Sequence, residues 1–476
     1  MHNLLTDHGA LNAPARPVSV QDEAKTLFLA MREEPYRVRA EARRFLERSL
    51  LATRTQPCDL PADPAGLDAW CEQHTVRVGQ AYRDYLAERK GGAPRRYFPN
   101  QAGALYFLRG AAPTKLVDGA WLYGVLKHWG DAAYHGLIRT YLEELGDGVE
   151  DKNHVALYQN LLARHGCDQW EDLSDEHFVQ GALQLALATH GADMLPELVG
   201  YNLGYEQLPL HLLITAYELN ELGIDPYYFT LHVTVDNASN GHAKRAIDAV
   251  RQLMQHASDP AEFWRRVVDG YRLNDLGAST NSIIASFDLD AELERILVAK
   301  GAVGKHLHSD YCKIEGRAIS DWLTDAADMP ELLAAFQRTG WIQRGHKAEE
   351  SRFWGLVSGT RAQMFGVFSA YELQVLRDWI EYSPGQPGPR VASFRARQRV
   401  LESGMPERVA SHAPRGLIRQ QASDDPNGLR QFELQVAQAG SKSAMMELLI
   451  AQMSPARHHT LTGLMATRMY ARLLDA

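Results

Sequence analysis

The segment YYFTLHVTVDNASNGH, residues 227–242, places an imidazole and a carboxylate four residues apart, at His232 and Asp236, and a second imidazole at His242. On a helix, residues i and i+4 lie one turn apart on the same face, so His232 and Asp236 can point at one object. Neutral imidazole and carboxylate are groups that iron, manganese and zinc accept from a protein. The segment therefore predicts part of a metal site, and the remaining ligands must come from elsewhere in the chain.

The local sequence favours a helix for this segment. Asp225-Pro226 is typical of an N-cap followed by a first-turn proline. Residues 230–235 are rich in β-branched side chains, which by propensity alone also suit a short strand. In a strand His232 and Asp236 would still share a face, so the metal prediction holds for either form.

The rest of the chain predicts an all-α fold. Ala, Leu, Glu, Arg and Gln dominate, and apolar residues recur at spacings of three and four, as at Leu157 and Leu161. Turn-forming sequence divides the chain into three expected parts: a helical N-terminal extension over residues 1–95, a core over residues 96–275 that holds the Asp, Glu and His clusters, and a helical C-terminal region over residues 276–476.

Charge and composition exclude several classes of protein. The 476 residues carry a net charge of -9, which argues against a nucleic-acid partner, because such a partner requires a clustered basic face. No apolar run reaches the about 20 residues that cross a bilayer, and the N-terminus lacks the features of a signal peptide. We therefore expect no membrane partner and a cytoplasmic location. The four cysteines form no CxxC pair, which excludes a thiolate zinc or iron–sulfur site.

A second pair of candidate ligands lies upstream, at Glu144 and His154. We expect Glu144 to end one helix and His154 to open the next, so that the short turn between them can bring a carboxylate and an imidazole together. Each residue also has an ordinary structural role open to it, Glu144 as a solvated last-turn residue and His154 as a capping or surface histidine.

A third candidate comes from a helix that is otherwise apolar and small, in which Glu197 and Glu206 each need a partner. Their spacing of nine residues puts them half a turn out of phase at about 100° per residue, so only one can face a shared site. Glu206 has the more apolar surroundings and is favoured. The alternative is that Glu206 pairs with a nearby arginine.

The pattern of these residues resembles the heme-oxygenase-like diiron oxidases and oxygenases over residues 110–255. The resemblance implies a heme-oxygenase-like helical bundle core with helical N- and C-terminal extensions. It also implies two non-heme irons per chain that activate O2 as cosubstrate. The iron ligands that it implies are Glu144, His154, Glu206, His232 and Asp236.

The family's reactions are N-oxygenation, desaturation and oxidative C–C cleavage in specialised metabolism. The resemblance therefore implies a small-molecule substrate derived from an amino acid, with a fatty acyl chain as the alternative. A reductase that recharges the irons and a second copy of the chain are the candidate partners. Residues 276–476 are expected to complete the substrate pocket, to mediate dimerisation or to form a degenerate second bundle.

The sequence departs from the family pattern at two positions. The family commonly has a histidine three residues after the aspartate, where this chain has Ser239. His242 is the expected substitute, but six residues turn it about 120° away from Asp236, so it reaches the site only if the helix bends or ends just before it. The first-helix ligand, usually a glutamate, is best matched by Asp118, for which the alternative is an N-cap of the helix that follows.

Tyr205 and Glu218 are candidates for hydrogen bonds that orient the ligands, although core packing of the tyrosine and solvent exposure of the glutamate are alternatives. A rival metal pattern, His-x-His-x-Asp at residues 306–310, has no second cluster at a convincing spacing, so a polar turn is favoured there. His458-His459 is a weaker candidate still. Two further functions stay open: a metal-free bundle with a buried polar network and a hydrolytic role, and a helical interaction protein.

Overall fold

Helices account for nearly all regular structure in the computed structural model, which describes residues 23–235, 241–305, 311–382 and 426–475. The strands β1 (Lys313–Ile314) and β2 (Arg317–Ala318) form one short antiparallel hairpin. The predicted all-α class is therefore confirmed. Within the described residues, none of the helices has both the length and the apolar character that a membrane crossing requires.

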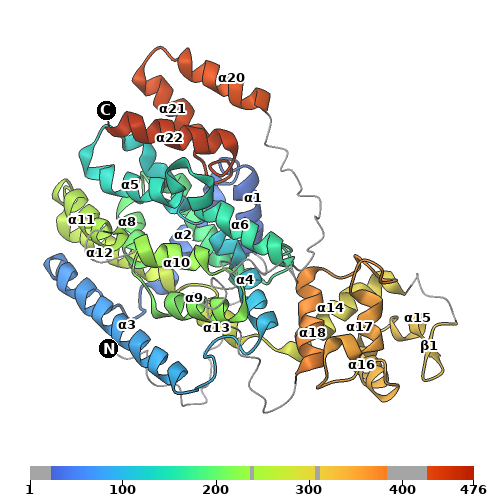
Figure 1. Cartoon of the computed structure of the whole chain (residues 1–476). Helices are drawn as coiled ribbons and strands as arrows, with labels where there is room; N and C mark the ends of the chain where they lie inside the picture. Colours follow the sequence, from blue (N-terminus) through green and yellow to red (C-terminus); the bar gives the residue numbers. More distant parts are fainter. Residues whose placement is uncertain (1–22, 236–240, 306–310, 383–425, 476) are drawn as a thin grey trace, which may run out of the picture.

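The central helices form a bundle in which α10 contacts α6 and α9, and α11 contacts α5 and α8 (Figure 1). Helices in this bundle are short and joined by 3-10 turns, so several of their ends meet in the interior. The elements are α4 (Gln101–Lys115), η2 (Ala120–His128), η3 (Ala132–Tyr134), α5 (His135–Glu144), η4 (Gly146–Gly148), η5 (Glu150–Lys152), α6 (His154–His165), η6 (Asp175–Phe178), α7 (Val179–His190), α8 (Leu195–Tyr205), α9 (Leu210–Leu222), α10 (Tyr227–Val235), α11 (His242–Gln255), α12 (Pro260–Arg272), η7 (Leu273–Asp275) and α13 (Thr280–Ala285).

Two glycines allow α8 and α12 to lie against each other. A Cβ atom at Gly200 would lie 1.9 Å from the carbonyl oxygen of Val267, and one at Gly270 would lie 2.0 Å from that of Glu197. Only a residue without a side chain fits at such distances. This close contact fixes the position of α8, whose C-terminal end carries Glu206.

The N-terminal helices share the hydrophobic core of the bundle. They are α1 (Glu23–Glu33), α2 (Arg39–Thr53) and α3 (Leu67–Lys90), with the 3-10 turn η1 (Pro64–Gly66) between α2 and α3. Helices α1 and α2 pack on α7, and α3 packs on α9 and α11. Phe28 of α1 contacts Trp170 and Phe178 edge to face, at ring-centroid distances of 6.0 and 5.5 Å.

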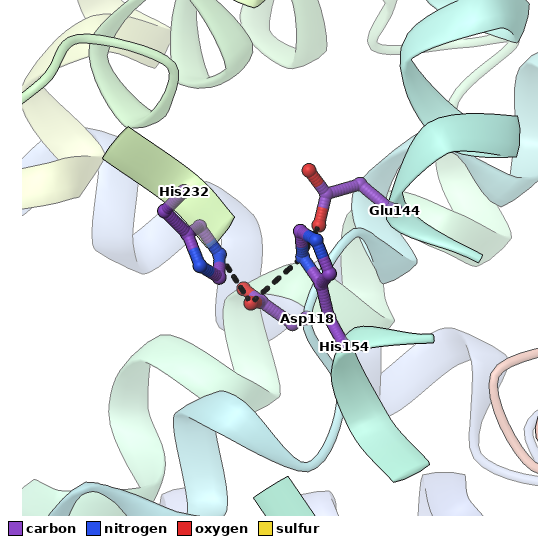
Figure 2. A group of neighbouring side chains, drawn as sticks. All are labelled: Asp118, Glu144, His154 and His232. Carbon is purple, nitrogen blue, oxygen red and sulfur yellow. Dashed lines mark hydrogen bonds and ion pairs between the residues drawn. The ribbon is translucent and has the colours of Figure 1, made fainter. Parts of the chain in front are cut away.

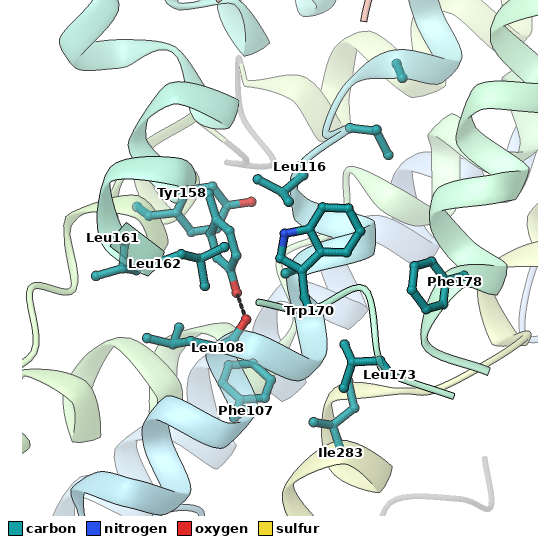
Figure 3. Close-up of a cluster of buried hydrophobic side chains, with 14 of the residues drawn as sticks. Phe107, Leu108, Leu116, Tyr158, Leu161, Leu162, Trp170, Leu173, Phe178 and Ile283 are labelled. Carbon is teal, nitrogen blue, oxygen red and sulfur yellow. Dashed lines mark hydrogen bonds between the residues drawn. The ribbon is translucent and has the colours of Figure 1, made fainter. Parts of the chain in front are cut away.

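A buried apolar cluster joins α4 to α6 (Figure 3). It includes Leu108 of α4, Leu116 directly after α4, and Leu161 and Leu162 of α6, and the Tyr158 hydroxyl donates a hydrogen bond to the carbonyl oxygen of Leu108 at 2.7 Å. The cluster sets the distance between the C-terminal end of α4 and the N-terminal end of α6. Asp118 lies three residues after the end of α4, and His154 is the first residue of α6.

The C-terminal region divides into two differently placed groups of helices (Figure 1). The first, called the lobe below, lies to one side of the bundle and comprises α14 (Leu289–Gly304), α15 (Ile319–Trp322), η8 (Ala326–Asp328), α16 (Met329–Arg338), η9 (Ala348–Glu350), α17 (Arg352–Val357) and α18 (Ala370–Glu381). The second returns to the bundle and comprises α20 (Pro426–Ala437), α21 (Lys442–Gln452) and α22 (Leu461–Asp475).

Hydrogen bonds tie the returning helices to the bundle. The Tyr470 hydroxyl of α22 donates to the carbonyl oxygen of Leu126 at 2.7 Å, and the Tyr141 hydroxyl of α5 donates to that of Met453 at 2.6 Å. Both tyrosines are completely buried. Helix α5, which carries Glu144, is therefore supported from the C-terminal end of the chain as well as from its sequence neighbours.

Candidate metal centre

Two sets of buried side chains that could hold a metal ion meet inside the bundle. The first set is Asp118, Glu144, His154 and His232, and the second is Glu144, Glu206 and His242. Within each set, the ligand atoms all lie within 4.8 Å of one another. Glu144 belongs to both sets. Figure 2 shows the first set, with its four side chains converging from the loop after α4 and from α5, α6 and α10.

Asp118 lies in the short loop between α4 and η2, and Gly119 after it has φ 78°. A Cβ atom at Gly119 would lie 2.8 Å from the Cβ of Glu144, so a glycine is required for this loop to approach α5. The Asp118 carboxylate accepts hydrogen bonds from the hydroxyls of Tyr205 at 2.9 Å and Tyr228 at 2.5 Å. Asp118 is therefore part of the buried cluster, and the N-cap alternative is wrong because Gly119 occupies the cap position of η2.

Glu144 is the last residue of α5 and His154 is the first residue of α6, as predicted. The Oε2 atom of Glu144 lies 2.5 Å from Nδ1 of His154. Asn153, not His154, caps α6: its side-chain oxygen accepts from the Ala156 amide at 3.0 Å, and its amide nitrogen donates to the Leu145 carbonyl at 3.3 Å. These two bonds hold the end of α5 against the start of α6.

Residues 227–235 form the helix α10, so the strand alternative for this segment is wrong. Asp225 accepts a hydrogen bond from the Tyr227 amide at 3.0 Å, as expected of a residue that begins a helix. His232 lies on the inner face, where Nδ1 donates to the carbonyl oxygen of Tyr228 at 2.8 Å and Nε2 lies 3.2 Å from Oδ2 of Asp118. Asp236 and Ser239 lie outside the described residues, so the ligand prediction for Asp236 stays a prediction.

His242 reaches the cluster because the chain leaves the helical conformation just before it. Gly241 has φ -85° and ψ -162°, and α11 begins at His242. The predicted interruption is confirmed. Nδ1 of His242 lies 2.9 Å from Oε2 of Glu206 and 3.4 Å from Oε1 of Glu144.

Glu143 was not predicted, yet it fixes the orientation of His242. Nε2 of His242 donates to Oε2 of Glu143 at 3.0 Å, and Arg245 binds the same carboxylate through two nitrogens at 2.8 and 2.7 Å. Burial opposes ionisation, but the hydrogen bonds from His242 and Arg245 lower the pKa of Glu143 to about 2. A basic residue three positions after a candidate histidine was the available sequence signal, but it does not identify its partner 102 residues upstream.

Glu206 and Glu197 face opposite sides of α8, as their spacing predicted. Glu206 is the C-cap residue of α8 and is buried in the cluster. Glu197 instead binds Arg266 of α12 through both oxygens, at 2.6 and 2.7 Å. The arginine pairing considered for Glu206 therefore belongs to Glu197.

The carboxylates and imidazoles of the first set shift each other's pKa values. Burial opposes ionisation of Asp118, but Lys115, His154 and His232 outweigh it and hold the pKa of this carboxyl well below its usual value. Burial likewise opposes ionisation of Glu144, but His154 lowers its pKa.

Burial also disfavours the charged form of His154, but the two carboxylates raise its pKa to about 10. Without a metal, His154 is therefore an imidazolium at neutral pH. A cation is stable at this position even though water is excluded.

The geometry of the imidazoles fits a bound metal. In His232 and His242 the outer ring nitrogen donates to the Tyr228 carbonyl and to Glu143, and the inner nitrogen lies 3.2 Å from Asp118 and 2.9 Å from Glu206, respectively. A proton or a metal ion on the inner nitrogen would satisfy this arrangement. Nδ1 of His154 is buried and has no partner in hydrogen-bond geometry, although Glu144 lies 2.5 Å away. Imidazole nitrogen and carboxylate oxygen form a donor set that suits iron.

Of the two residues predicted to orient ligands, Tyr205 contacts Asp118, while Glu218 does not meet the prediction. Glu218 is completely buried, and its carboxylate accepts from the Tyr85 hydroxyl at 2.8 Å and from the backbone amides of residues 96–98 at 2.5 to 3.0 Å. It secures the segment that leads into α4. The solvent-facing alternative for Glu218 is also wrong.

The rival candidates do not add to these sets. The pattern at residues 306–310 lies outside the described residues. His458 is buried, and its Nδ1 accepts a hydrogen bond from Asn153 at 3.0 Å. It therefore supports the α6 cap, and neither His458 nor His459 belongs to a metal-compatible set among the described residues.

Comparison with known proteins gives one match. Residues 105–275 match the family described as iron-containing redox enzyme. This range contains every described residue of the two sets: Asp118, Glu144, His154, Glu206, His232 and His242. Searches of curated proteins and of solved structures found no match.

Proposed function

Since residues 105–275 match the iron-containing redox enzymes, a family of oxidoreductases, we propose that this chain is a non-heme diiron oxidase or oxygenase that uses O2. The observation that carries the proposal is the position of Glu144. Its two carboxylate oxygens face two different imidazoles, Oε2 facing His154 and Oε1 facing His242. A carboxylate placed in this way can bridge two metal ions.

Each iron has its own residues in this proposal. Asp118, His154 and His232 would hold the first iron, Glu206 and His242 would hold the second, and Glu144 would be shared. Asp236, four residues after His232, is proposed as a further ligand from its sequence position alone. When bound, two ferrous ions supply the electrons that reduce O2 so that a substrate beside them is oxidised.

The surrounding side chains hold the ligands in place and exclude water. Tyr205 and Tyr228 donate to the two oxygens of Asp118, which fixes the carboxylate plane. The Tyr228 carbonyl fixes the tautomer of His232, and Glu143 fixes that of His242. Such hydrogen bonds to ligands typically change metal affinity or activity about 10- to 100-fold.

The substrate and the reaction are proposed from the family resemblance. A small molecule derived from an amino acid is the first choice and a fatty acyl chain the second, with N-oxygenation, desaturation or oxidative C–C cleavage as the reaction. A reductase that returns the irons to the ferrous state is the proposed protein partner. The cytoplasm is the proposed compartment, because the four cysteines are scattered along the sequence without a CxxC pair, as suits a reducing environment.

Iron content tests the proposal directly. The purified chain is loaded with Fe(II) without oxygen, desalted and analysed, and about two irons per chain are expected. O2 uptake is then measured with a chemical reductant. Glu206→Gln is expected to lose about one iron, whereas Glu197→Gln, a matched change of a buried carboxylate on the same helix, is expected to keep both.

Two results would contradict the proposal. A correctly folded wild-type chain that retains no iron would leave the cluster as a metal-free polar network. Equal iron loss in Glu206→Gln and Glu197→Gln would show that helix α8 responds to any lost carboxylate, so that Glu206 has no special role. Circular dichroism of each variant separates loss of metal from loss of helix.

A further inference from the structure

Lys115 is a positively charged side chain beside the metal cluster that the proposed ligand sets do not use. It is the last residue of α4, three positions before Asp118. Its Nζ lies 3.1 Å from the Tyr205 hydroxyl and 3.8 Å from Oδ1 of Asp118. The Tyr205 hydroxyl donates to Asp118 and accepts from Lys115, so the three groups form one chain of hydrogen bonds.

The Lys115 ammonium has hydrogen-bonding capacity left over. An ammonium has three N–H donors, and among the described residues Tyr205 is its one hydrogen-bond acceptor. The rings of Tyr205 and Tyr228 lie 5.2 and 5.8 Å from Nζ and stabilise the charge from the side. Two donors therefore remain for solvent or for a ligand.

Lys115 also lies at the boundary between the buried cluster and solvent. The side chains of Asp118 and His154 are at most 1% exposed, whereas that of Lys115 is 19% exposed. His211 is a half-buried neighbour of Lys115. Burial and the positive charge of Lys115 lower the pKa of His211 to about 4. His211 is therefore neutral at pH 7 and leaves Lys115 as the cation here.

The net charge of the metal-loaded site indicates what Lys115 can bind. Two divalent cations would neutralise four carboxylates, which is the number reached if Asp236 is counted with Asp118, Glu144 and Glu206. Arg245, which also lies beside the cluster, is already paired with Glu143. The charge of Lys115 is therefore in excess once the irons are bound, and an anion beside it would restore neutrality.

We propose that Lys115 binds a free carboxylate of the substrate and so determines which substrates enter. The inference rests on the proposed function, which supplies the two irons, and it narrows the substrate class. An ammonium with donors left over forms a charge-assisted hydrogen bond to a carboxylate oxygen and balances its charge. Amino acids and free fatty acids carry this group, whereas amines, alcohols and acyl thioesters do not.

The test measures binding rather than turnover. Hexanoate and hexan-1-ol, which share one alkyl chain, are titrated calorimetrically into the Fe(II)-loaded chain without oxygen. Hexanoate is expected to bind more tightly than hexan-1-ol. Lys115→Gln should weaken hexanoate about 10- to 100-fold, as loss of a charge-assisted hydrogen bond predicts, and leave hexan-1-ol unchanged. Lys115→Arg, which keeps the charge, should retain most of the affinity.

The matched control is Lys25→Gln. Lys25 is also half-buried beside an aromatic ring, with Nζ 5.5 Å from the centre of Phe178 and 3.1 Å from the carbonyl oxygen of Leu173, but it belongs to α1. This variant removes one positive charge from the chain elsewhere. It is expected to bind hexanoate with wild-type affinity.

Iron content is measured on every sample, so the two proposals fail separately. Unchanged hexanoate affinity in Lys115→Gln with both irons present would overturn the role of Lys115 and leave the diiron proposal standing. Loss of iron in Lys115→Gln would also overturn it, since the ammonium would then serve the metal ligands. A wild-type chain without iron would contradict the diiron function itself.

Discussion

The bundle and the lobe both bury carboxylates, but they neutralise them differently. In the lobe, Glu292 is 5% exposed and accepts from Nε and Nη2 of Arg295, both at 2.8 Å, and from the Tyr371 hydroxyl at 2.7 Å. In the bundle, Asp118, Glu144 and Glu206 face imidazoles.

This difference distinguishes a buried carboxylate that stabilises the fold from one that can bind a metal. A buried carboxylate is costly unless a cation or several donors compensate it. In the lobe Arg295 supplies a permanent cation, so Glu292 needs no metal to balance its charge. In the bundle the imidazoles can lose their protons, and a metal can then take the place of the proton.

The largest effect is expected for Glu144, which both metal sets share. Glu144→Gln should reduce the iron content from about two to fewer than one per chain, because an amide is a weaker ligand and cannot bridge two metals equally. Glu292→Gln in the lobe should keep both irons. Elemental analysis of the loaded variants decides, and equal iron content in the two variants would remove the distinction between the regions.

Iron binding should depend on pH through His154. Glu144 and Asp118 raise the pKa of His154 to about 10 in the metal-free chain, so a metal must displace a proton at pH 7. Affinity is expected to fall about tenfold for each pH unit below 10, per proton displaced. Calorimetry in buffers of different ionisation enthalpy counts the released protons, and a count of zero would contradict the coupling.

The same shift has a consequence for the stability of the metal-free chain. The folded-state pKa of His154 lies above its usual value of 6.5, so the protonated form stabilises the fold. This contribution is fully present below pH 6.5 and is lost as the pH rises through about 10. Urea unfolding of the metal-free chain between pH 6 and about 10 should show the loss, and His154→Gln should lack it.

Glu218 should affect stability without affecting iron. Glu218→Gln replaces a carboxylate that accepts from Tyr85 and three backbone amides, and it is expected to cost about 2–3 kcal/mol in the free energy of unfolding. Urea unfolding gives the cost and elemental analysis gives the iron content. Loss of iron at unchanged stability would restore Glu218 to the metal site.

The smallest effects are expected for carboxylates that arginine already neutralises. Glu292→Gln should cost about 1–2 kcal/mol, since Arg295 is partly exposed and water screens the lost pair. Glu47→Gln, which removes an exposed pair with Arg43 on α2, should stay within about 0.5 kcal/mol. If both variants cost the same, burial would not decide the strength of these pairs.

Much of the site could be predicted from helical periodicity and from the turn-forming residues at helix ends. The nine-residue spacing showed that Glu197 and Glu206 face opposite ways, and Ser-Asn-Gly before His242 indicated the break that brings this histidine inward. Glu218 shows what the sequence could not predict. It was predicted to orient the ligands or to face solvent, but the structure places it, buried, on residues 96–98.

The sequence by itself determined the all-α class, the residue types of the metal sets and the helix ends on which they lie, because helical periodicity and turn propensity act over a few neighbouring residues. Tertiary structure alone decided that Glu144 faces two histidines, that Glu143 holds His242, and that Lys115 adjoins Asp118 and Tyr205. These contacts join helix ends up to about a hundred residues apart, and their geometry depends on how the helices pack. A periodic pattern identifies the inner face of a helix, but not which other helix that face meets.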